Sequence, residues 1–318
     1  MLEHSIDSPF LRKLEGYGII NAKGAEALDL LNRLSTNRVV GMTQGDARET
    51  VLTNEKGRII DVVTVLACEE GLCILTSEGK EAEVAAWLDK YTIMEDVSYS
   101  SSTDEYQLFR LYNTNGSLTV DTPGPGRWKQ LESGGTELHM VAQESVTGGK
   151  YTIMLPQDAE RTAIQALLEA GTEPKEPSDE EYRLWRIRNG IPAVGYELTD
   201  LVNPLESGAG KVVDFEKGCY IGQEVIARLD SYDKVQRKLR KLQFDTKIEA
   251  AIEPGTALLS GGKNAGFITS VAFDPELETT IGLGCIRNAY TAEGSELELL
   301  LDDSTYRLRV VESFGGNE

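Results

Sequence analysis

The sequence predicts an α+β protein that ends in a small antiparallel β-barrel. A chain of 318 residues is too long for one compact core and indicates two or three domains. Up to about residue 236, strand and helix patterns alternate and several strands pair as hairpins, which favours α+β over a doubly wound sheet. From residue 237 onward, short strand patterns follow one another between Gly, Asp and Pro turns. This spacing is typical of a small barrel.

Apolar spacing sets the expected elements of the first part. Apolar residues three or four apart predict a helix over 24–34, and apolar runs predict the strands around it. The turn Asn54-Glu55-Lys56-Gly57 joins two strands as a hairpin. Ser178 and Glu181 form a capping-box pattern at the start of a later helix. The expected strands are 18–22, 48–53, 58–67, 72–76, 106–112 and 150–155, and the expected helices are 24–34, 79–90, 157–170, 178–189 and 222–229.

Two further stretches complete the predicted layout. The run Pro-Gly-Pro-Gly at 123–126 marks 113–135 as a surface excursion outside regular structure. The barrel strands are expected at 239–245, 256–260, 266–273, 281–287, 297–301 and 306–311. We therefore expect two interleaved α+β subdomains over residues 1–236 and a barrel domain over residues 237–318.

Composition limits the partners that we expect. The net charge of −20 argues against a protein that holds nucleic acid through its phosphates, because such binding needs a basic surface. No apolar run approaches the roughly 20 residues that a membrane span requires. Residues 1–5 show neither the basic region nor the apolar core of a signal peptide. We expect a cytoplasmic protein that touches neither nucleic acid nor membrane directly.

The cysteine pattern argues against a complete metal site within the chain. The four cysteines form no C-x-x-C pair, and the sequence has two histidines. A zinc or iron–sulfur site needs more ligands at closer spacing, so we expect no metal held by this chain alone. In a cytoplasmic protein, Cys68, Cys73 and Cys285 are expected to be reduced packing residues.

The stretch 217–224, Lys-Gly-Cys-Tyr-Ile-Gly-Gln-Glu, contains the cysteine that is the candidate reactive residue of the chain. Cys219 precedes an expected helix and follows Lys217, and both features would lower the pKa of the thiol and raise its reactivity. The flanking glycines would let the backbone turn sharply and approach a ligand. The alternative is a small apolar cysteine buried behind the helix. Spacing alone leaves both interpretations open.

This octapeptide resembles the signature of the YgfZ family, folate-binding relatives of the glycine-cleavage T-protein that support iron–sulfur enzymes. Other parts of the chain are similar to the same superfamily, in the same order: 31–37, 44–45, 52–61, 186–192, 203–206, 266–270 and 281–284. The resemblance implies a T-protein-like folate-binding fold, with interleaved α+β subdomains around a central cavity and a C-terminal barrel. It implies tetrahydrofolate, or a related folate, as the cofactor.

The resemblance also implies a set of site residues. Cys219 and Lys217 would carry the chemistry. Folate contacts are expected from Tyr17, Tyr182, Asn37, Asp61, Tyr220, Gln223, Glu224 and Arg228. For the first two tyrosines the alternative is ordinary packing with a solvated hydroxyl. The implied partners are iron–sulfur enzymes, tRNA-modifying ones among them, or cluster carriers.

A rival function is a folate-dependent aminomethyltransferase or demethylase of the T-protein type. T-proteins carry a pair of acidic residues after two glycines, and Asp61 matches one of this pair. Asp61 could therefore serve as the catalytic acid, or it could be an outward-facing strand residue without such a role. Arg188 stands where relatives have a glutamate that faces the pterin, which counts against the rival. A basic run could hold the glutamate tail of folate or could simply be a solvated strand edge. This run comprises Lys234, Arg237, Lys238, Arg240 and Lys241.

Overall fold

The computed structural model describes residues 9–112, 118–142, 145–168, 174–231, 235–302 and 304–313. Within these ranges the chain forms two compact units. The first, which we call the sheet unit, combines Ile6–Pro177 with Val212–Gln223. The second, which we call the barrel unit, combines Ser178–Lys211 with Glu224–Glu318. The barrel unit thus takes in residues 178–211 and the stretch that begins at 224, although residues 1–236 were expected to form the first region of the chain.

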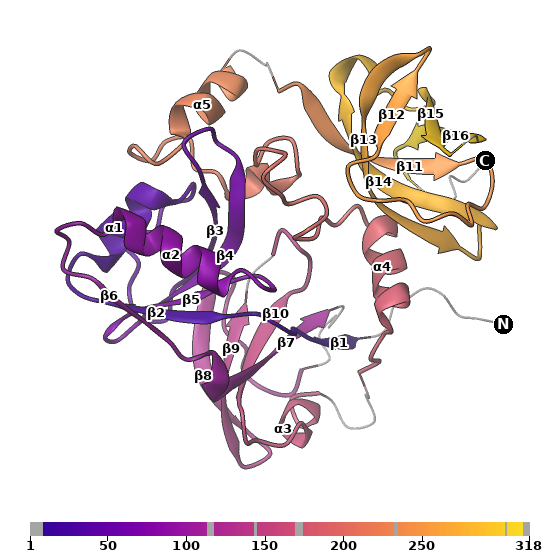
Figure 1. The fold of residues 1–318 in the computed structure, drawn as a ribbon. Coiled ribbons are helices and arrows are strands. Elements are labelled where there is room, and N and C mark those ends of the chain that lie inside the picture. Colours follow the sequence, from indigo (N-terminus) through magenta and orange to yellow (C-terminus); the bar gives the residue numbers. More distant parts are fainter. Residues whose placement is uncertain are drawn as a thin grey trace. The chain divides into compact units, whose positions relative to one another are not determined.

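The sheet unit contains two five-stranded antiparallel sheets (Figure 1). The strand orders are β3-β4-β5-β2-β6 and β1-β7-β10-β9-β8. The first sheet consists of β2 (Ile19–Lys23), β3 (Ala47–Thr53), β4 (Ile59–Cys68), β5 (Gly71–Leu75) and β6 (Ser98–Ser101). The second consists of β1 (Phe10–Lys13), β7 (Tyr106–Tyr112), β8 (Arg127–Ser133), β9 (Thr136–Ala142) and β10 (Tyr151–Pro156).

Helices α1 (Ala27–Leu34) and α2 (Glu81–Tyr91) cover one face of the first sheet (Figure 1). The apolar side of α1, with Leu30, Leu31 and Leu34, is buried against this sheet, as the spacing predicts. Trp87 and Leu88 of α2 join the same core. Burial of this continuous apolar face stabilises a short helix that would be marginal alone.

Two predictions for the second sheet are wrong. The excursion expected over 113–135 contains β8, which pairs with β9 along its whole length; residues 113–117 lie outside the described ranges. The helix expected over 157–170 is reduced to α3 (Thr162–Gln165). The last two residues of the expected helix, 169 and 170, lie outside the described ranges. Ser133 Oγ donates to the carbonyl of Ala163 at 2.8 Å, and Thr119 N donates to that of Leu167 at 2.9 Å. Donors from other segments thus take carbonyls that a longer helix would use.

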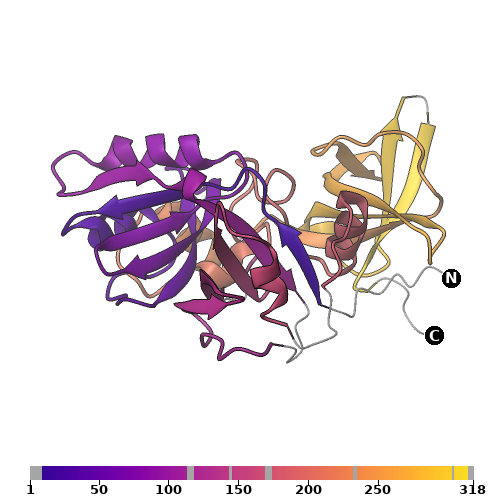
Figure 2. The same cartoon turned by 90° about the horizontal axis from the view of Figure 1, so that it is seen from below.

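The predicted barrel is confirmed. Six strands of the described chain close in the order β11-β14-β13-β12-β15-β16, all neighbours antiparallel, and they curve around a common interior (Figure 2). Their bounds are β11 (Arg237–Phe244), β12 (Ala257–Ser260), β13 (Lys263–Asp274), β14 (Thr279–Arg287), β15 (Glu296–Leu301) and β16 (Ser304–Val311). Apolar side chains such as Leu242, Phe244 and Leu258 fill the interior.

Helix α4 (Asp179–Arg188) packs on the barrel within the same unit. The capping box predicted for Ser178 and Glu181 is present. Arg186 donates to the buried Glu197 at 3.0 Å and to Ser270 of β13 at 2.6 Å. Thr269 of the same strand donates to the other carboxylate oxygen at 2.6 Å. This satisfied buried network fixes the helix to the strand, because loss of one partner would leave a buried charge unpaired.

The remaining helix is α5 (Gln223–Ser231). Among the described residues, no helix has both the length and the apolar character needed to cross a membrane.

Candidate functional site

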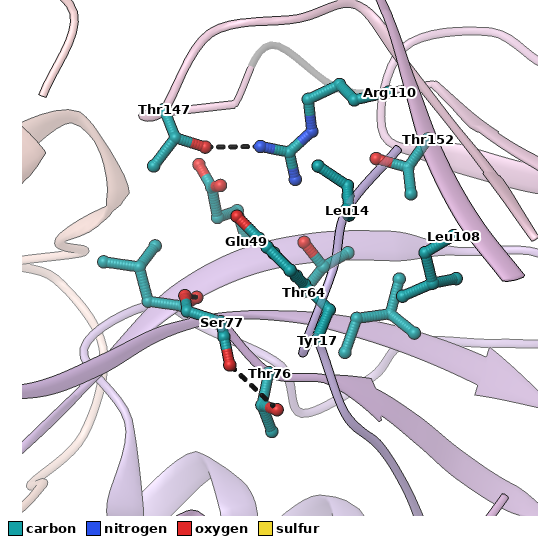
Figure 3. Close-up of a pocket in the computed structure, with 12 residues that line it drawn as sticks. Leu14, Tyr17, Glu49, Thr64, Thr76, Ser77, Leu108, Arg110, Thr147 and Thr152 are labelled. Atoms are coloured by element: carbon teal, nitrogen blue, oxygen red, sulfur yellow. Dashed lines mark hydrogen bonds between the residues drawn. The ribbon is translucent and has the colours of Figure 1, made fainter. Parts of the chain in front are cut away.

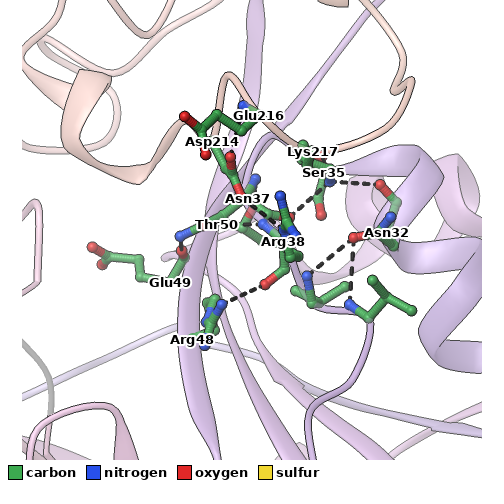
Figure 4. Close-up of polar contacts among 12 residues, drawn as sticks. Asn32, Ser35, Asn37, Arg38, Arg48, Glu49, Thr50, Asp214, Glu216 and Lys217 are labelled. Carbon is green, nitrogen blue, oxygen red and sulfur yellow. Dashed lines mark hydrogen bonds and ion pairs between the residues drawn. The ribbon is translucent and has the colours of Figure 1, made fainter.

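The segment that carries the octapeptide is fixed to the sheet unit by a buried lysine. Lys217 is 6% exposed, and its Nζ donates to the carbonyls of Asn32, Ser35 and Asn37 at 2.7, 2.6 and 2.8 Å. These three acceptors match the three donors of an ammonium group. Figure 4 shows the lysine directed at the loop that follows α1. Burial lowers the pKa of Lys217 to about 8.

Further bonds hold the segment on both sides of Lys217. Thr36 Oγ1 donates to the carbonyl of Val212 at 2.9 Å, and Arg38 pairs with Asp214 at 3.0 Å. On the other side, Thr53 Oγ1 donates to the carbonyl of Ile221 at 2.7 Å. The segment is therefore anchored at its start, middle and end.

Glycine is required at Gly222 for two reasons. Its φ is +82°, a conformation that other residues adopt at a cost, and an added Cβ would lie 2.6 Å from the carbonyl oxygen of Asn54. Gly218 differs, because no atom lies within 4 Å of the position of an added Cβ. Close approach to the β3–β4 turn therefore explains the second glycine of the octapeptide and leaves the first unexplained.

Cys219 projects from this anchored segment and is exposed. The other three cysteines, all within the described ranges, are buried or half-buried. Burial raises the pKa of the Cys285 thiol to about 12 and also raises the pKa of Cys68 and Cys73. The alternative of a buried, packing Cys219 is therefore excluded, and the other cysteines are positioned as inert thiols. The ammonium group of Lys217 donates to backbone carbonyls. That Lys217 raises the reactivity of the Cys219 thiol therefore stays a prediction.

A polar pocket lies in the sheet unit, and Tyr17 forms part of its wall (Figure 3). Glu49 is 7% exposed and accepts hydrogen bonds from Ser145 Oγ and from Val146 N, both at 2.6 Å. Arg110 donates to Thr147 at 2.5 Å, and its guanidinium carbon lies 6.0 Å from the centre of the Tyr17 ring. The pocket thus joins an aromatic wall to a carboxylate and a guanidinium.

Asp61 lies beneath this pocket. It is fully buried and accepts hydrogen bonds from Val62 N at 2.8 Å and from Ser77 N at 2.9 Å, and both of these residues line the pocket. Desolvation raises the pKa of Asp61 to about 6, although these donors act in the opposite direction. The alternative of an outward-facing strand residue is therefore wrong. A buried carboxyl that titrates near neutrality is suited to proton transfer.

The other predicted residues are divided between the two units. In the sheet unit, Asn37 donates through Nδ2 to the carbonyl of Glu49 at 2.9 Å, and the ring of the buried Tyr220 lies 5.3 Å from Lys217 Nζ. Gln223 ends the sheet-unit segment. In the barrel unit, Tyr182 stacks on Trp185 with ring centres 6.0 Å apart. Glu224 and Arg228 are exposed on α5. The folate contacts of all these residues stay predictions.

Arg188, which the resemblance aligns with a glutamate of relatives, forms ion pairs within the barrel unit. Its Nε and a terminal nitrogen donate to the two carboxylate oxygens of Asp274 at 2.7 and 2.5 Å, and it also pairs with Glu276. This fork fixes the guanidinium on β13. In the basic run, Lys234 lies outside the described ranges, and Arg237 pairs with the buried Glu206 at 3.2 Å.

Glu49 and Arg110 were not among the residues expected at the site. Each is a charged residue inside a largely buried strand, Ala47–Thr53 and Tyr106–Tyr112 respectively. Charged residues are rarely buried unless they are paired, so a charge within a buried strand was a usable signal. The hydrogen-bond partners of Glu49 come from a distant turn, 96 and 97 residues along the chain.

The fold defines a class of protein. The solved structure of the glycine cleavage system aminomethyltransferase T from Bartonella henselae aligns with a TM-score of 0.76 at 18% identity, covering 97% of this chain and 86% of that one. Both therefore share the T-protein fold.

Sequence comparison shows the family. Residues 14–217 match the GCVT N-terminal domain, and residues 237–314 match the glycine cleavage T-protein C-terminal barrel domain. The chain therefore belongs to the glycine cleavage T-protein family. An aminomethyltransferase of Symbiobacterium thermophilum is 25% identical, over 93% of this chain and 83% of that protein. A putative chloroplastic transferase of Arabidopsis thaliana is 25% identical, over 89% of this chain and 66% of that protein. These matches define the superfamily and do not single out its YgfZ branch.

Proposed function

We propose that the protein binds tetrahydrofolate and uses Cys219 to support the assembly or repair of iron–sulfur clusters in other enzymes, as YgfZ-type proteins do. The observation that carries this proposal is the thiol itself. Cys219 is exposed, while the segment beneath it is held by three bonds from Lys217. A thiol on a rigid support can meet a partner protein without a cost of ordering the chain.

The pocket around Tyr17 has the chemistry that a pterin needs. A flat heterocycle requires an aromatic wall, and its amide edge carries N–H donors that a carboxylate such as Glu49 accepts. The free volume of the pocket is about 10 Å³, which is room for about one water. Binding would therefore require movement of wall side chains such as Arg110.

The role of Cys219 follows from ligand chemistry. The thiol would lose its proton to solvent, and its sulfur would form a bond to an iron atom as another ligand of that iron leaves. One cysteine supplies one ligand, so the remaining ligands must come from the partner enzyme or carrier. Within the described residues, no three side chains of His, Cys, Asp or Glu lie together as metal ligands.

A second candidate function rests on Asp61. Its pKa of about 6 is suited to a group that exchanges a proton with a folate nitrogen near neutral pH. This property favours an aminomethyltransferase or demethylase. The named aminomethyltransferases among the relatives agree with that alternative. It predicts turnover that Asp61→Asn abolishes and Cys219→Ser leaves intact.

Titration calorimetry with tetrahydrofolate under anaerobic conditions tests the binding step. The wild type should bind, Tyr17→Ala and Glu49→Gln should bind at least about tenfold more weakly, and Tyr17→Phe should retain affinity because the ring remains. Thermal unfolding of each variant checks that it is folded. Absence of binding by the wild type, or equal binding by Tyr17→Ala, would rule out this pocket as the folate site.

A further inference from the structure

A second concave site lies wholly within the barrel unit. It has a volume of about 510 Å³, within the range of small-molecule pockets. Its lining includes Asn189, Gly190, Gly208, Arg240, Lys241 and Thr291. None of these residues belongs to the Tyr17 pocket, which lies in the sheet unit.

The pocket lies beside the first part of β11, which does not pair with β16. Strand β14 pairs with β11 from Arg237 to Gln243, whereas β16 pairs with it only from Lys241 to Phe244. Toward its start, β11 therefore lacks a strand neighbour on the β16 side. Unpaired strand edges carry backbone groups that need other partners.

The side chain of Arg240 provides hydrogen-bond donors to backbone carbonyls at this edge. Its Nε donates to the carbonyl of Thr291 at 3.2 Å, and a terminal nitrogen donates to the carbonyl of Leu239 at 3.0 Å. Two carbonyls from different segments thus orient the half-buried guanidinium. Among the residues that the structure describes, no carboxylate lies within ion-pair distance of it. A guanidinium has five N–H donors, so donors remain for a ligand.

Lys241 brings a second cation to the same pocket. Its Cε would lie 3.1 Å from a Cβ added at Gly190, so the glycine allows the lysine to approach the turn after α4. Burial lowers the pKa of Lys241, and a nearby anion would favour its charged form. Glu293 and Glu312 also line the pocket, but both are exposed, where solvent and salt screen their charge.

We propose that this pocket binds the oxyanion of a small molecule, either a carboxylate or a phosphate group, with Arg240 as its principal contact and Lys241 as the second. A solvated strand edge would leave the arginine free in water. Here the side chain is half-buried and held at a cavity, in a chain whose net charge is −20. A planar guanidinium that is already oriented loses little freedom when an oxyanion binds in a bidentate manner.

Calorimetric titration with two probes tests the site and separates the sources. One probe is inorganic phosphate and the other is γ-glutamylglutamate, each compared with sodium chloride at equal ionic strength. We expect at least one probe to bind the wild type, and Arg240→Gln to weaken that binding by at least about tenfold. Lys238→Gln is the matched control, because Lys238 is exposed on the same strand and does not line the pocket. The probe that binds identifies the class of anion.

Two results would overturn the proposal. One is that neither probe binds beyond the chloride control. The other is that Arg240→Gln, folded by circular dichroism, binds as the wild type does. If Arg240→Gln does not fold, Lys241→Met decides in its place, and unchanged binding by that variant would overturn the proposal.

Discussion

Replacing Gly222 by Ala should destabilise the sheet unit, whereas the same change at Gly218 should have little effect. Both glycines belong to the octapeptide around Cys219, and they differ in their surroundings. Gly222 has φ +82°, and an added Cβ would lie 2.6 Å from Asn54 O and 2.9 Å from Gly57 Cα. These are backbone atoms, which cannot swing away as the end of a side chain can.

The magnitude has two parts. A non-glycine residue in the left-handed region costs about 1–2 kcal/mol. Relief of the clash would move Ile221, whose carbonyl accepts from Thr53 Oγ1 at 2.7 Å, and loss of such a bond costs about 1 kcal/mol. We therefore expect Gly222→Ala to lower the free energy of unfolding by about 2–3 kcal/mol, and Gly218→Ala to change it by less than about 0.5 kcal/mol.

Urea unfolding followed by tryptophan fluorescence measures the difference. In a Trp185→Phe background the remaining tryptophans, Trp87 and Trp128, both report on the sheet unit. A loss of about 2–3 kcal/mol lowers the midpoint by about 0.7–3 M at a typical slope. Equal midpoints for the two alanine variants would refute the claim that Gly222 is required by its contact with the β3–β4 turn.

Three further predictions concern the same unit. Lys217→Met should lower the stability of the sheet unit by about 3 kcal/mol or more, because three backbone carbonyls lose a charged donor. The same urea assay measures this loss, and a change below about 1 kcal/mol would contradict the role of the lysine as an anchor. Burial raises the pKa of Asp61 from 3.8 to about 6, so the folded state binds more protons than the unfolded state between these pH values. Stability should therefore fall by about 2 kcal/mol as the pH rises from 4 to 7. Asp61→Asn should flatten this profile, and an unchanged profile would count against the assignment. Thiol titration with a disulfide reagent should modify one cysteine rapidly in the native protein and none in Cys219→Ser, because the other three are buried or half-buried; rapid reaction of a second thiol would contradict this.

Much of the fold could be predicted from local patterns. All six barrel strands were expected within a few residues of their observed bounds, because short strand patterns recur there between Gly, Asp and Pro turns. The capping box at Ser178 was likewise visible in the sequence, since both of its partners lie within four residues.

The elements that were missed depend on distant contacts. The strands β1, β6, β8 and β9 were not predicted. The edge strands β1 and β6 have only four residues each, and β6 and β8 are largely polar, so their own residues do not indicate a strand. They form because a neighbouring strand offers free backbone groups, as β9 does for β8. The expected helix at 157–170 failed for a related reason, because donors from other segments took its carbonyls.

The candidate site was predictable in part. Cys219 could be singled out from its octapeptide, but its exposure could not. The role of Lys217 was not visible, since its three acceptors lie 180 to 185 residues away in the chain. Glu49 was overlooked because its burial and its bonds to Ser145 and Val146 arise only in the folded unit.

The most direct test of the central claim is the rescue of a strain that lacks this protein. The readout is the activity of a [4Fe–4S] enzyme, such as a tRNA methylthiolase, in strains that express the wild type, Cys219→Ser or Gly218→Ala at equal levels. The account predicts rescue by the wild type and Gly218→Ala, and none by Cys219→Ser. Full rescue by Cys219→Ser would contradict the thiol mechanism, and cluster enzymes that stay active without the protein would contradict the accessory function itself.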